Sequence, residues 1–507
     1  DVFRQMLDEN GYTYTGGAYV SAITTPDGQT LKAGAGGANS GWMYAVNGKL
    51  GSVYADAYVL KDGDRVLWFY TDDFMSDGRV DGDEITPDPS VPLPDYTAQW
   101  GGFRGNNGGL TASLTPRTAA QSKLKWAATL KEADDFMTAV SEPLVIGEHV
   151  YIAVGTHLVV LDKDGRVTAK GALAGAIGYT CRPLYSSGRV LVPLADGSLQ
   201  ALAADSLKTV WLTNAPAPYE SADGPLAHQA LTTLTGDGDR LYMGTACADW
   251  VSSYYGVYRC IDAATGRVIW EYVNEKSGYY WSGAARIGAA LLIAGDDGIL
   301  TSLDAENGAV IDTANLGAPV RSTLATSGNT LLAVTTDGVL HTLTVTDGRL
   351  SGHKSVAFAA SSTSSPTVYD GRVYVGGGLS EADDYAGLLA VIDLDTLAVI
   401  QKVTAPGDVK SAPLVATGYD GTVYAYFTAN AEPGAVYVLT SGEPASTAAA
   451  LYTPAEENWN YCMASVVADA AGVLYYVNDS GKLFAIANTG ADEENPSNPT
   501  DPKPAPT

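Results

Sequence analysis

Short runs of alternating hydrophobic and polar residues cover most of the chain from about residue 120 onward. Asp-Gly pairs stand between many of these runs, as in SGRVLVPLADGSLQAL and GAALLIAGDDGILTSL. A period of two residues interrupted by such turns predicts antiparallel hairpins. The hydrophobic runs are too short to span a membrane as helices. We therefore expect a mainly β protein without a membrane span.

The hairpins recur with a period of roughly 40 residues. Five segments align on an acidic turn between two strands, namely VLDKDGRVTAKGA, ALAADSLKTVWLT, CIDAATGRVIWEY, SLDAENGAVIDTA and VIDLDTLAVIQKV. Each segment follows another pair of strands, so the repeating unit is a four-stranded meander, which is typical of propeller blades. The starts of the innermost strands predict eight blades, near Glu142, Arg182, Gln229, Gly283, Ser322, Pro366, Pro413 and Ser465.

The last unit of the repeat is one strand short. Its sequence, ASVVADAAGVLYYVNDSGKLFAIAN, ends after the third strand, whereas a spare strand, KLKWAATL, precedes the first unit. An open sheet would expose the unpaired backbone groups of its edge, so borrowing the spare strand stabilises the ring. We therefore predict that Lys123–Leu130 completes the last blade and closes an eight-bladed propeller.

Two motifs of this region resemble a known family. WGGFRGNNGG begins at Trp100, and the turn DAATG leads to Trp270. Together they resemble the pyrroloquinoline-quinone-like (PQQ-like) propeller superfamily over residues 100–488. Its members range from quinone-dependent alcohol dehydrogenases to a non-enzymatic outer-membrane assembly lipoprotein and many surface proteins. The resemblance therefore implies a fold and leaves the chemistry open.

The same resemblance implies a role for the tryptophans of the repeat. In the family these side chains dock between neighbouring blades. Trp126 and Trp211 occupy the repeat position of Trp270, whereas Asp312 and Gln401 stand there in two other blades.

Residues 1–85 form a separate unit at the front of the chain. SGWMYAVNG and AYVLKDGDRVLWFYTD resemble the transcobalamin-C-terminal-like domain of Gram-positive surface proteins, over residues 1–73. The resemblance implies a small α/β domain of the ubiquitin-like (β-grasp) type whose first hairpin is missing, with DVFRQMLDENGYTY as its helix. Proline-rich residues 86–99 are expected to form a linker. The acidic, proline-rich residues 489–507 are expected to be disordered.

The charge of the chain restricts its partners. Thirty basic residues stand against 57 acidic ones, which gives a formal net charge of −27. Such a surface repels nucleic-acid phosphates and anionic lipid headgroups, so we expect neither as a ligand. It favours solubility, and we expect a monomeric protein that is extracellular, either secreted or on the cell surface.

Two groups of residues carry alternative interpretations. Cys247 and Cys260 flank one short segment, so they either form a disulfide or are buried thiols. The acidic segment DFMSDGRVDGDE places Asp73, Asp77 and Glu84 at positions 1, 5 and 12 of a twelve-residue calcium loop. Its third residue is a methionine, which cannot bind calcium, so an acidic solvated turn is the alternative. No other cofactor is expected.

The sequence offers no catalytic constellation. Five histidines are scattered over separate strands and loops, and no two cysteines are adjacent. His341 lies in the alternating strand GVLHTLTV, which is typical of a hydrogen-bonded histidine inside a blade. Quinone catalysis needs a metal, a carboxylate base and aromatic walls at the propeller axis, and no such set aligns with the blade starts. We therefore expect a protein that is not an enzyme.

Aromatic residues provide the functional hypothesis. Several lie where the chain should cross from one blade to the next, and these crossings converge near the axis. Tyrosine and tryptophan side chains suit sugars and proteins because they stack and donate hydrogen bonds. We predict a binding or adhesion protein for a carbohydrate or protein partner; a quinone- or metal-dependent oxidoreductase, a cobalamin- or cofactor-capturing surface protein and a pure spacer are the alternatives. The candidate ligand-binding residues are Tyr179, Tyr279, Tyr280, Trp281, Trp459, Tyr461, Trp250 and Tyr254.

Overall fold

The chain divides into two compact units, Asp1–Ile85 and Thr86–Thr507. The structure is a computed structural model that describes, in the first unit, residues 7–8, 10–16, 19–26, 28, 30–35, 40–46, 49–50, 58–61 and 66–71. In the second unit it describes residues 91–489, apart from 106–107, 112–113, 133–134, 180, 222–223, 249–252, 381–385, 419 and 445–446. None of the helices in the described parts has the length and hydrophobicity that crossing a bilayer requires.

The first unit contains two small antiparallel sheets. One has the order β1-β2-β3 and the other the order β5-β4-β6. Their strands are β1 (Thr13–Gly16), β2 (Val20–Thr24), β3 (Thr30–Lys32), β4 (Gly41–Val46), β5 (Lys49–Leu50) and β6 (Val66–Thr71). Leu7 is helical and packs with Val20 and Ile23 in the core. The predicted helix ends too late, because Thr13 and Tyr14 already pair with β2.

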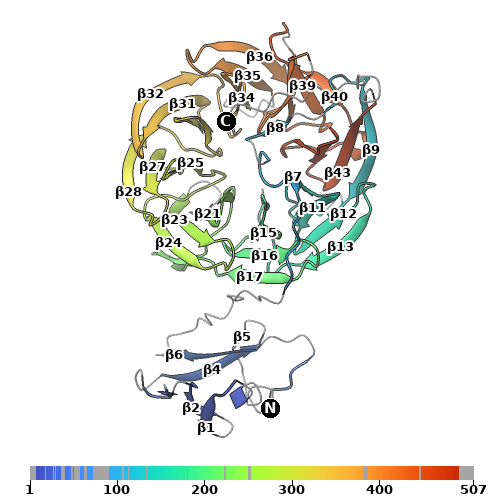
Figure 1. The fold of residues 1–507 in the computed structure, drawn as a ribbon. Coiled ribbons are helices and arrows are strands. Elements are labelled where there is room, and N and C mark those ends of the chain that lie inside the picture. Colours follow the sequence, from blue (N-terminus) through green and yellow to red (C-terminus); the bar gives the residue numbers. More distant parts are fainter. Residues whose placement is uncertain are drawn as a thin grey trace. The chain divides into compact units, whose positions relative to one another are not determined.

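The second unit is a ring of blade-like sheets (Figure 1). Among the described residues, eight of its sheets contain four antiparallel strands that run from the axis outward. The first two comprise β10 (Leu144–Ile146), β11 (His149–Val154), β12 (His157–Leu161) and β13 (Val167–Ala172), then β14 (Leu184–Ser186), β15 (Arg189–Pro193), β16 (Leu199–Ala203) and β17 (Thr209–Thr213). A hairpin of β18 (Tyr219–Ser221) and β19 (Gly224–Leu226) follows.

The third and fourth sheets continue the same pattern. They comprise β20 (Thr235–Asp237), β21 (Arg240–Gly244), β23 (Ser253–Asp262) and β24 (Val268–Asn274), with β22 (Cys247–Ala248) paired to β23, then β25 (Ala285–Ile287), β26 (Ala290–Ala294), β27 (Ile299–Asp304) and β28 (Val310–Asn315). The fifth and sixth comprise β29 (Ala325–Ser327), β30 (Thr330–Thr335), β31 (Val339–Thr346) and β32 (Arg349–Ala357), then β33 (Thr367–Tyr369), β34 (Arg372–Gly378), β35 (Gly387–Asp393) and β36 (Val399–Ala405).

The seventh sheet comprises β37 (Leu414–Thr417), β38 (Val423–Thr428), β39 (Val436–Thr440) and β40 (Ala449–Tyr452). A short 3-10 helix, η1 (Glu456–Asn458), leads to the last sheet, which contains β41 (Val467–Ala468), β42 (Leu474–Val477), β43 (Lys482–Asn488) and β9 (Ser122–Thr129). β9 runs antiparallel to β43, with Trp126 opposite Ala485. The prediction that Lys123–Leu130 completes the last sheet is therefore confirmed.

Hydrophobic residues fill the spaces between neighbouring sheets. Leu191 of the second sheet packs with Met243 of the third, and Leu292 of the fourth with Leu331 of the fifth. The cluster around the last sheet includes residues of the seventh sheet and also Ile152 of the first. Because strands alternate their side chains, each blade buries one set against the blade before it and the other against the blade after it.

The repeat tryptophans join neighbouring blades as the family resemblance implies. Trp126 Nε1 donates to Lys163 O at 2.8 Å, and Trp211 Nε1 donates to Ala263 O at 3.2 Å. In the two blades that have Asp312 or Gln401 at the tryptophan position, the polar side chain accepts a hydrogen bond from the backbone of the next blade. Asp312 Oδ2 accepts from the backbone N–H of Leu350 at 2.9 Å. Gln401 Oε1 likewise accepts from the N–H of Gly442 at 3.0 Å.

Part of the expected linker 86–99 belongs to the propeller. Val91 packs against the second and third sheets, and the hydroxyl of Tyr185 donates to Tyr96 O at 3.0 Å. β7 (Ala98–Trp100) then pairs with β10. The chain is therefore fixed to the blades before residue 100. The predicted disordered tail lies outside the described residues, except for Thr489.

Candidate functional site: the propeller axis and its crossing face

A ring of residues surrounds the axis where each innermost strand begins. One residue from each blade occupies the equivalent position, and we call this ring the girdle. Its residues are Glu142, Arg182, Thr233, Gly283, Thr323, Ser365, Ala412 and Ser465. Parallel bridges join Thr233 to Gly283 and Gly283 to Thr323. The sequence predicts the blade starts but does not show that their side chains form one ring.

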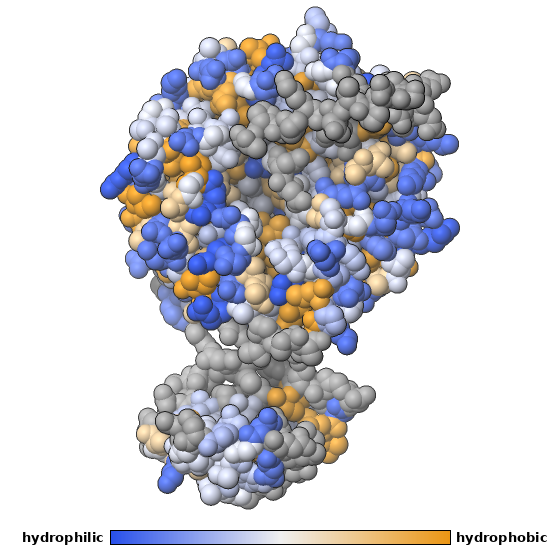
Figure 2. Space-filling view, viewed as in Figure 1, coloured by the Kyte–Doolittle hydropathy of each residue, from blue (hydrophilic) through white to orange (hydrophobic). Residues whose placement is uncertain are grey.

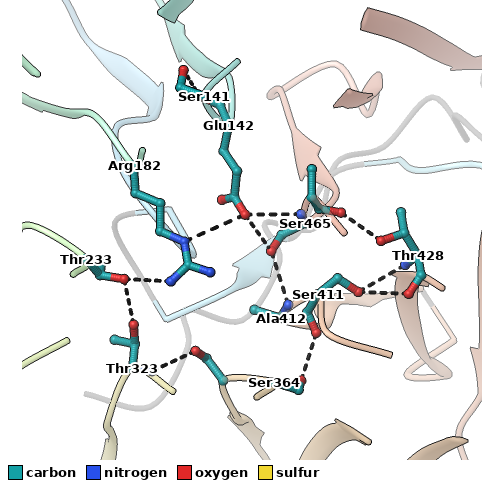
Figure 3. A network of polar contacts seen from close by, with 12 residues as sticks. Ser141, Glu142, Arg182, Thr233, Thr323, Ser364, Ser411, Ala412, Thr428 and Ser465 are labelled. Atoms are coloured by element: carbon teal, nitrogen blue, oxygen red, sulfur yellow. Dashed lines mark hydrogen bonds and ion pairs between the residues drawn. The ribbon is translucent and has the colours of Figure 1, made fainter. Parts of the chain in front are cut away.

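Hydrogen bonds link the girdle residues around the axis (Figure 3). Arg182 Nη1 donates to Thr233 Oγ1 at 2.7 Å, and the Thr233 and Thr323 hydroxyl oxygens lie 2.8 Å apart. On the other side, Ser465 Oγ donates to Glu142 Oε1 at 3.0 Å, and Arg182 Nε lies 3.9 Å from the same carboxylate oxygen. The girdle therefore binds the first blade to the last through polar contacts.

The residue before each girdle position fixes the strand to its own blade. Ser141 Oγ accepts from the N–H of Ala153 at 2.9 Å, and Ser364 Oγ accepts from the N–H of Gly376 at 3.0 Å. Ser322 Oγ donates to Val334 O at 3.0 Å. Each partner is twelve residues further along the chain. A small hydroxyl side chain at this repeat position therefore satisfies backbone groups where the strand begins.

The segment between β7 and β8 (Leu110–Thr111) crosses the ring near the axis. β7 adds to the first sheet, and β8 pairs in parallel with β37 of the seventh sheet (Figure 1). Between them, Arg104 Nη2 donates to Leu324 O at 3.0 Å, and its Nη1 donates to Pro366 O. The Arg182 guanidinium lies 3.7 Å from the centre of the Phe103 ring. This segment therefore binds to blades on several sides of the ring.

Burial lowers the pKa of both guanidinium groups near the axis, those of Arg104 and Arg182. Burial, together with the nearby Arg182 guanidinium, lowers the pKa of Arg104 to about 10. Burial also lowers the pKa of Arg182, although Glu142 opposes that shift. Arg104 has a positive φ of 59°, which non-glycine residues rarely adopt. The Arg104 guanidinium is held by its hydrogen bonds to the backbone carbonyl oxygens of Leu324 and Pro366.

The predicted aromatic residues gather on one face, which we call the crossing face. It consists of the crossings between blades and the turns between the second and third strand of each blade. Hydrogen bonds from a crossing to a turn repeat around the ring, as from Ile177 N to Gly155 O at 2.9 Å and from Leu130 N to Gly481 O at 3.0 Å. All candidates except Trp250, which lies outside the described residues, can be placed relative to this face.

Tyr279, which was predicted to bind a ligand, is instead a buried residue that packs inside the propeller. It is 2% exposed and its ring meets that of Tyr258 edge-on, with the centroids 5.0 Å apart. Both belong to the hydrophobic cluster between the third and fourth sheets. The sequence GYYW could not show which of its aromatic residues points into the blade.

Tyr280 and Trp281 are half-buried at the crossing into the fourth blade. Their ring centroids are 5.1 Å apart, and the Arg321 guanidinium lies 4.6 Å from the centre of the Tyr280 ring. Arg321 is also paired with Asp296, with Nη2 and Oδ2 2.8 Å apart. This part of the crossing face is therefore already occupied by an internal ion pair.

Tyr179, Trp459 and Tyr461 are exposed, with 54%, 45% and 42% of their surface open to solvent. Two further exposed residues, which were not predicted from the sequence, lie on the crossing between the last and first blades. Phe136 and Met137 are 86% and 94% exposed, which makes them the most open hydrophobic side chains of the described propeller. An apolar pair inside the acidic loop EADDFMT was the available signal.

These five residues, which we call the exposed sector, lie on three crossings that follow one another around the ring. The crossing with Phe136 and Met137 binds the last blade through Leu130 N and Gly481 O, and the first blade through Gly155 N and Ala139 O at 2.9 Å. Tyr461 O accepts from the N–H of Asp479 at 2.9 Å. Burial, and secondly the carboxylate of Asp479, raise the pKa of the Tyr179 hydroxyl to about 12.

Tyr254 is exposed on β23, beyond the part of that strand that pairs with β21. Its neighbour Tyr255 stacks on Tyr219 of the adjoining hairpin, with ring centroids 4.7 Å apart. Tyr254 is therefore a surface residue of the third blade and is not part of the exposed sector. The face seen in Figure 2 mixes hydrophilic side chains with separate hydrophobic patches.

Cys247 and Cys260 do not form a disulfide, and both thiols are free and buried. Cys247 lies opposite Tyr255 on β23, five positions before Cys260 on the same strand. At about 3.4 Å per strand residue, that offset separates them by roughly 17 Å, far beyond the reach of a disulfide. The disulfide interpretation was wrong because the chain returns from β22 along β23 and carries Cys260 five residues beyond Tyr255, the residue that faces Cys247.

The candidate calcium residues Asp73, Asp77 and Glu84 lie outside the described residues. In the described parts of the chain, no three His, Cys, Asp or Glu side chains are grouped to hold a metal ion. The girdle has one carboxylate, Glu142, whose Oε1 already accepts from the N–H of Ser465 at 3.2 Å and from its hydroxyl. The girdle therefore does not fit a quinone that works beside a metal.

Sequence comparison agrees with this architecture. Residues 112–278 and 255–492 match the family described as outer membrane protein assembly factor BamB. The chain belongs to this family. Residues 1–72 match a domain of unknown function (DUF4430). No curated protein matches the chain.

Solved structures show the same fold at low sequence identity. BamB from Moraxella catarrhalis is 14% identical, with a TM-score of 0.51, and the match covers 72% of this chain and 99% of BamB. A quinohemoprotein alcohol dehydrogenase from Pseudomonas putida is 13% identical, with a TM-score of 0.58 and coverage of 81% and 82%. The quinohemoprotein alcohol dehydrogenase from Comamonas testosteroni is 13% identical, with a TM-score of 0.55 and coverage of 76% and 80%.

Proposed function

We propose that the propeller is a non-catalytic binding module of a cell-surface or secreted protein, and that it binds a protein partner through the exposed sector. The observation that carries this proposal is the solvent exposure of five large apolar or aromatic side chains on three successive crossings, namely Phe136, Met137, Tyr179, Trp459 and Tyr461. Large apolar side chains that stay exposed together on a folded protein mark interaction sites.

The composition of the sector favours a protein over a small ligand. Tyrosine, tryptophan, phenylalanine and methionine are the residues most enriched at the centres of protein interfaces. The sector lies on loops held by the rigid blades, so little order is lost when a partner binds. The name of the related BamB, an outer membrane protein assembly factor, also supports a protein partner.

A non-catalytic role is supported by the chemistry of the axis. Four of the eight girdle residues are small hydroxyl residues whose hydrogen bonds are already made, and the one girdle carboxylate is engaged by Ser465 and Arg182. A base held in this way is a poor proton acceptor for a substrate.

The sector can be tested with matched surface variants. A photo-crosslinking amino acid at position 137 should capture the partner on intact cells, whereas one at position 310 should not. The affinity for the purified partner is then measured for Phe136→Ser/Met137→Ser and for Val310→Ser/Ile400→Ser, whose residues are about half exposed on outer strands. We expect the first variant to bind at least about tenfold more weakly, because it loses roughly 1.5 kcal/mol or more of apolar contact.

An unchanged affinity in the sector variant, or an equal loss in the control variant, would exclude the exposed sector as the binding surface. A glycan array on the same proteins tests a carbohydrate partner, and specific glycan binding would replace the protein proposal. Incubation with PQQ and Ca²⁺, followed by a dye-linked dehydrogenase assay, tests the enzyme alternative. Turnover above that of a heat-denatured sample would refute the non-catalytic role.

A further inference from the structure

The fifth blade brings together two of the five histidines of the chain. His341 lies on β31 and His353 on β32, the outermost strand of that blade (Figure 1). His341 Nδ1 and His353 Nε2 are 3.0 Å apart, and the centroids of the two imidazole rings are 5.2 Å apart. His341 is buried, whereas His353 is exposed. The pair therefore connects the interior of the blade with its outer surface.

A β-bulge places His353 beside His341. The pairing of β31 with β32 shifts its register here, so that Gly352 and His353 together lie opposite the single residue Leu343. Gly352 has a φ of 62°, in the left-handed region that favours glycine. His341 pairs with Ser355, and alternation along β32 puts His353 on the same face of the sheet. The bulge therefore directs His353 toward His341, as bulges near functional sites commonly redirect a side chain.

The other side of the His341 ring is fixed by a chain of hydrogen bonds. Thr335 Oγ1 donates to Asp337 Oδ1 at 2.5 Å, so it accepts from His341 Nε2 at 3.1 Å. The proton of His341 is thus on Nε2, and the lone pair of Nδ1 points toward His353. Histidines that bind metals ordinarily donate their second ring N–H to a fixed acceptor, which sets the tautomer and the ring orientation. His341 is therefore already arranged as a metal ligand.

The spacing of the two nitrogens fits a shared metal ion. With metal–nitrogen bonds of about 2.05 Å, nitrogens 3.0 Å apart subtend an angle of about 94° at the metal. This angle is close to the right angle between neighbouring positions of a tetragonal site, the geometry that Cu²⁺ and Ni²⁺ adopt with nitrogen and oxygen ligands. It is narrower than the angle of a tetrahedral zinc site. Cu²⁺ is favoured because it binds most strongly among the divalent ions of the first transition row.

The two histidines leave most of the coordination sphere open. In the part of the chain that the structure describes, no third His, Cys, Asp or Glu side chain joins them to hold a metal ion. Because His353 is on the surface, water or a group of another molecule can reach the open positions. The net charge of −27 also attracts cations to the chain. The pair is therefore suited to a metal that binds reversibly, unlike a structural site closed by four protein ligands.

We propose that His341 Nδ1 and His353 Nε2 bind one Cu²⁺ ion at the outer surface of the fifth blade. On binding, His353 carries its proton on Nδ1, which leaves the lone pair of Nε2 for the metal. The metal then replaces the hydrogen bond between the two rings, and water fills the remaining positions. This inference is independent of the proposed protein-binding function, because neither histidine belongs to the exposed sector.

The first test titrates the full chain with Cu²⁺ alone. EPR spectroscopy counts the imidazole nitrogens on the bound ion, and competition with glycine measures the affinity. We expect two imidazole nitrogens in the wild type. His353→Gln should lose this signal and bind at least about tenfold more weakly, since even the loss of an outer-shell partner costs that much. His157→Gln, which changes an exposed histidine of the first blade, should bind as the wild type does.

The second test keeps both ligands and removes the support of His341. Thr335→Val eliminates the acceptor of the His341 Nε2–H, and Asp337→Ala, at the exposed end of the same chain of hydrogen bonds, acts in the same direction. Both variants should retain the signal of two imidazole nitrogens but bind Cu²⁺ about tenfold more weakly. Circular dichroism checks that each variant is folded.

Fewer than two imidazole nitrogens in the wild type, or wild-type affinity in His353→Gln, would overturn the copper site and leave the histidines as a hydrogen-bonded pair only. Wild-type affinity in both Thr335→Val and Asp337→Ala would overturn the positioning role of the hydrogen-bonded chain. None of these outcomes bears on the proposed function, which is tested by sector variants that keep both histidines.

Discussion

His341 permits a quantitative test of how the blades satisfy their buried polar groups. It is 5% exposed on β31, as expected for a hydrogen-bonded histidine inside a blade. Its Nε2 lies 3.1 Å from Thr335 Oγ1, and its Nδ1 lies 3.0 Å from His353 Nε2. Thr335 donates its own proton to Asp337 Oδ1 at 2.5 Å, so it accepts from His341. His341 is thus neutral, with its proton on Nε2 and with Nδ1 accepting from His353.

Burial, and secondly the neighbouring His353, lower the pKa of His341 to about 4, although Asp337 opposes the shift. The unfolded chain, with a histidine pKa of about 6.5, therefore binds more protons than the native protein between pH 4 and pH 6.5. Stability due to this residue is fully present above pH 6.5 and is lost as the pH falls through that window. Integration between pH 7.5 and pH 5 gives a loss of about 2 kcal/mol.

The substitution His341→Gln removes this titration while keeping an amide that can replace both hydrogen bonds. Urea unfolding followed by tryptophan fluorescence at pH 7.5 and pH 5 should show the wild type losing about 2 kcal/mol more than the variant. His157→Gln, at an exposed position, should follow the wild type. Histidine-selective NMR then measures the pKa directly. An imidazole pKa above 6, or parallel pH profiles for wild type and His341→Gln, would refute the reasoning.

Two further predictions concern contacts inside the propeller. Trp211→Ala should lower the free energy of unfolding by about 3–5 kcal/mol, because a fully buried indole and its hydrogen bond to Ala263 are lost. Gln401→Ala, at the same repeat position, should lower it by only about 1 kcal/mol. Urea titration of both variants measures these losses, and similar losses in the two variants would contradict the role of Trp211 in docking neighbouring blades. Cys247 and Cys260 should both react with a maleimide in urea without prior reduction, as mass spectrometry can show, and an unlabelled pair would mean that a disulfide exists after all.

Much of the architecture could be predicted because the blades are repetitive. Alternating strands with Asp-Gly turns recur along the chain, and a repeat that cannot bury its hydrophobic faces alone must pack on its neighbours. The spare strand before the first unit could be assigned to the last sheet because an open edge is unfavourable. Family resemblance gave the roles of Trp126 and Trp211, whose bonds to the next blade are confirmed.

The candidate site was predicted less well, for a reason visible in individual residues. Tyr279 and Tyr280 are neighbours in sequence, yet one is buried in the blade and the other is half-buried under Arg321. The direction of a side chain on an irregular crossing has no period that a sequence could reveal. Phe136 and Met137 were overlooked because a hydrophobic pair ordinarily indicates a core, and only the packing of the crossing shows that they remain outside.

The sequence by itself determined that this is a closed ring of four-stranded sheets, since local alternation and turn chemistry are written into each repeat. Only the tertiary structure decided which residues of different blades meet. The girdle joins Glu142 to Ser465, more than 300 residues away along the chain. Closing the ring brings the two ends of the repeat together, and such contacts depend on spatial proximity that no local pattern contains.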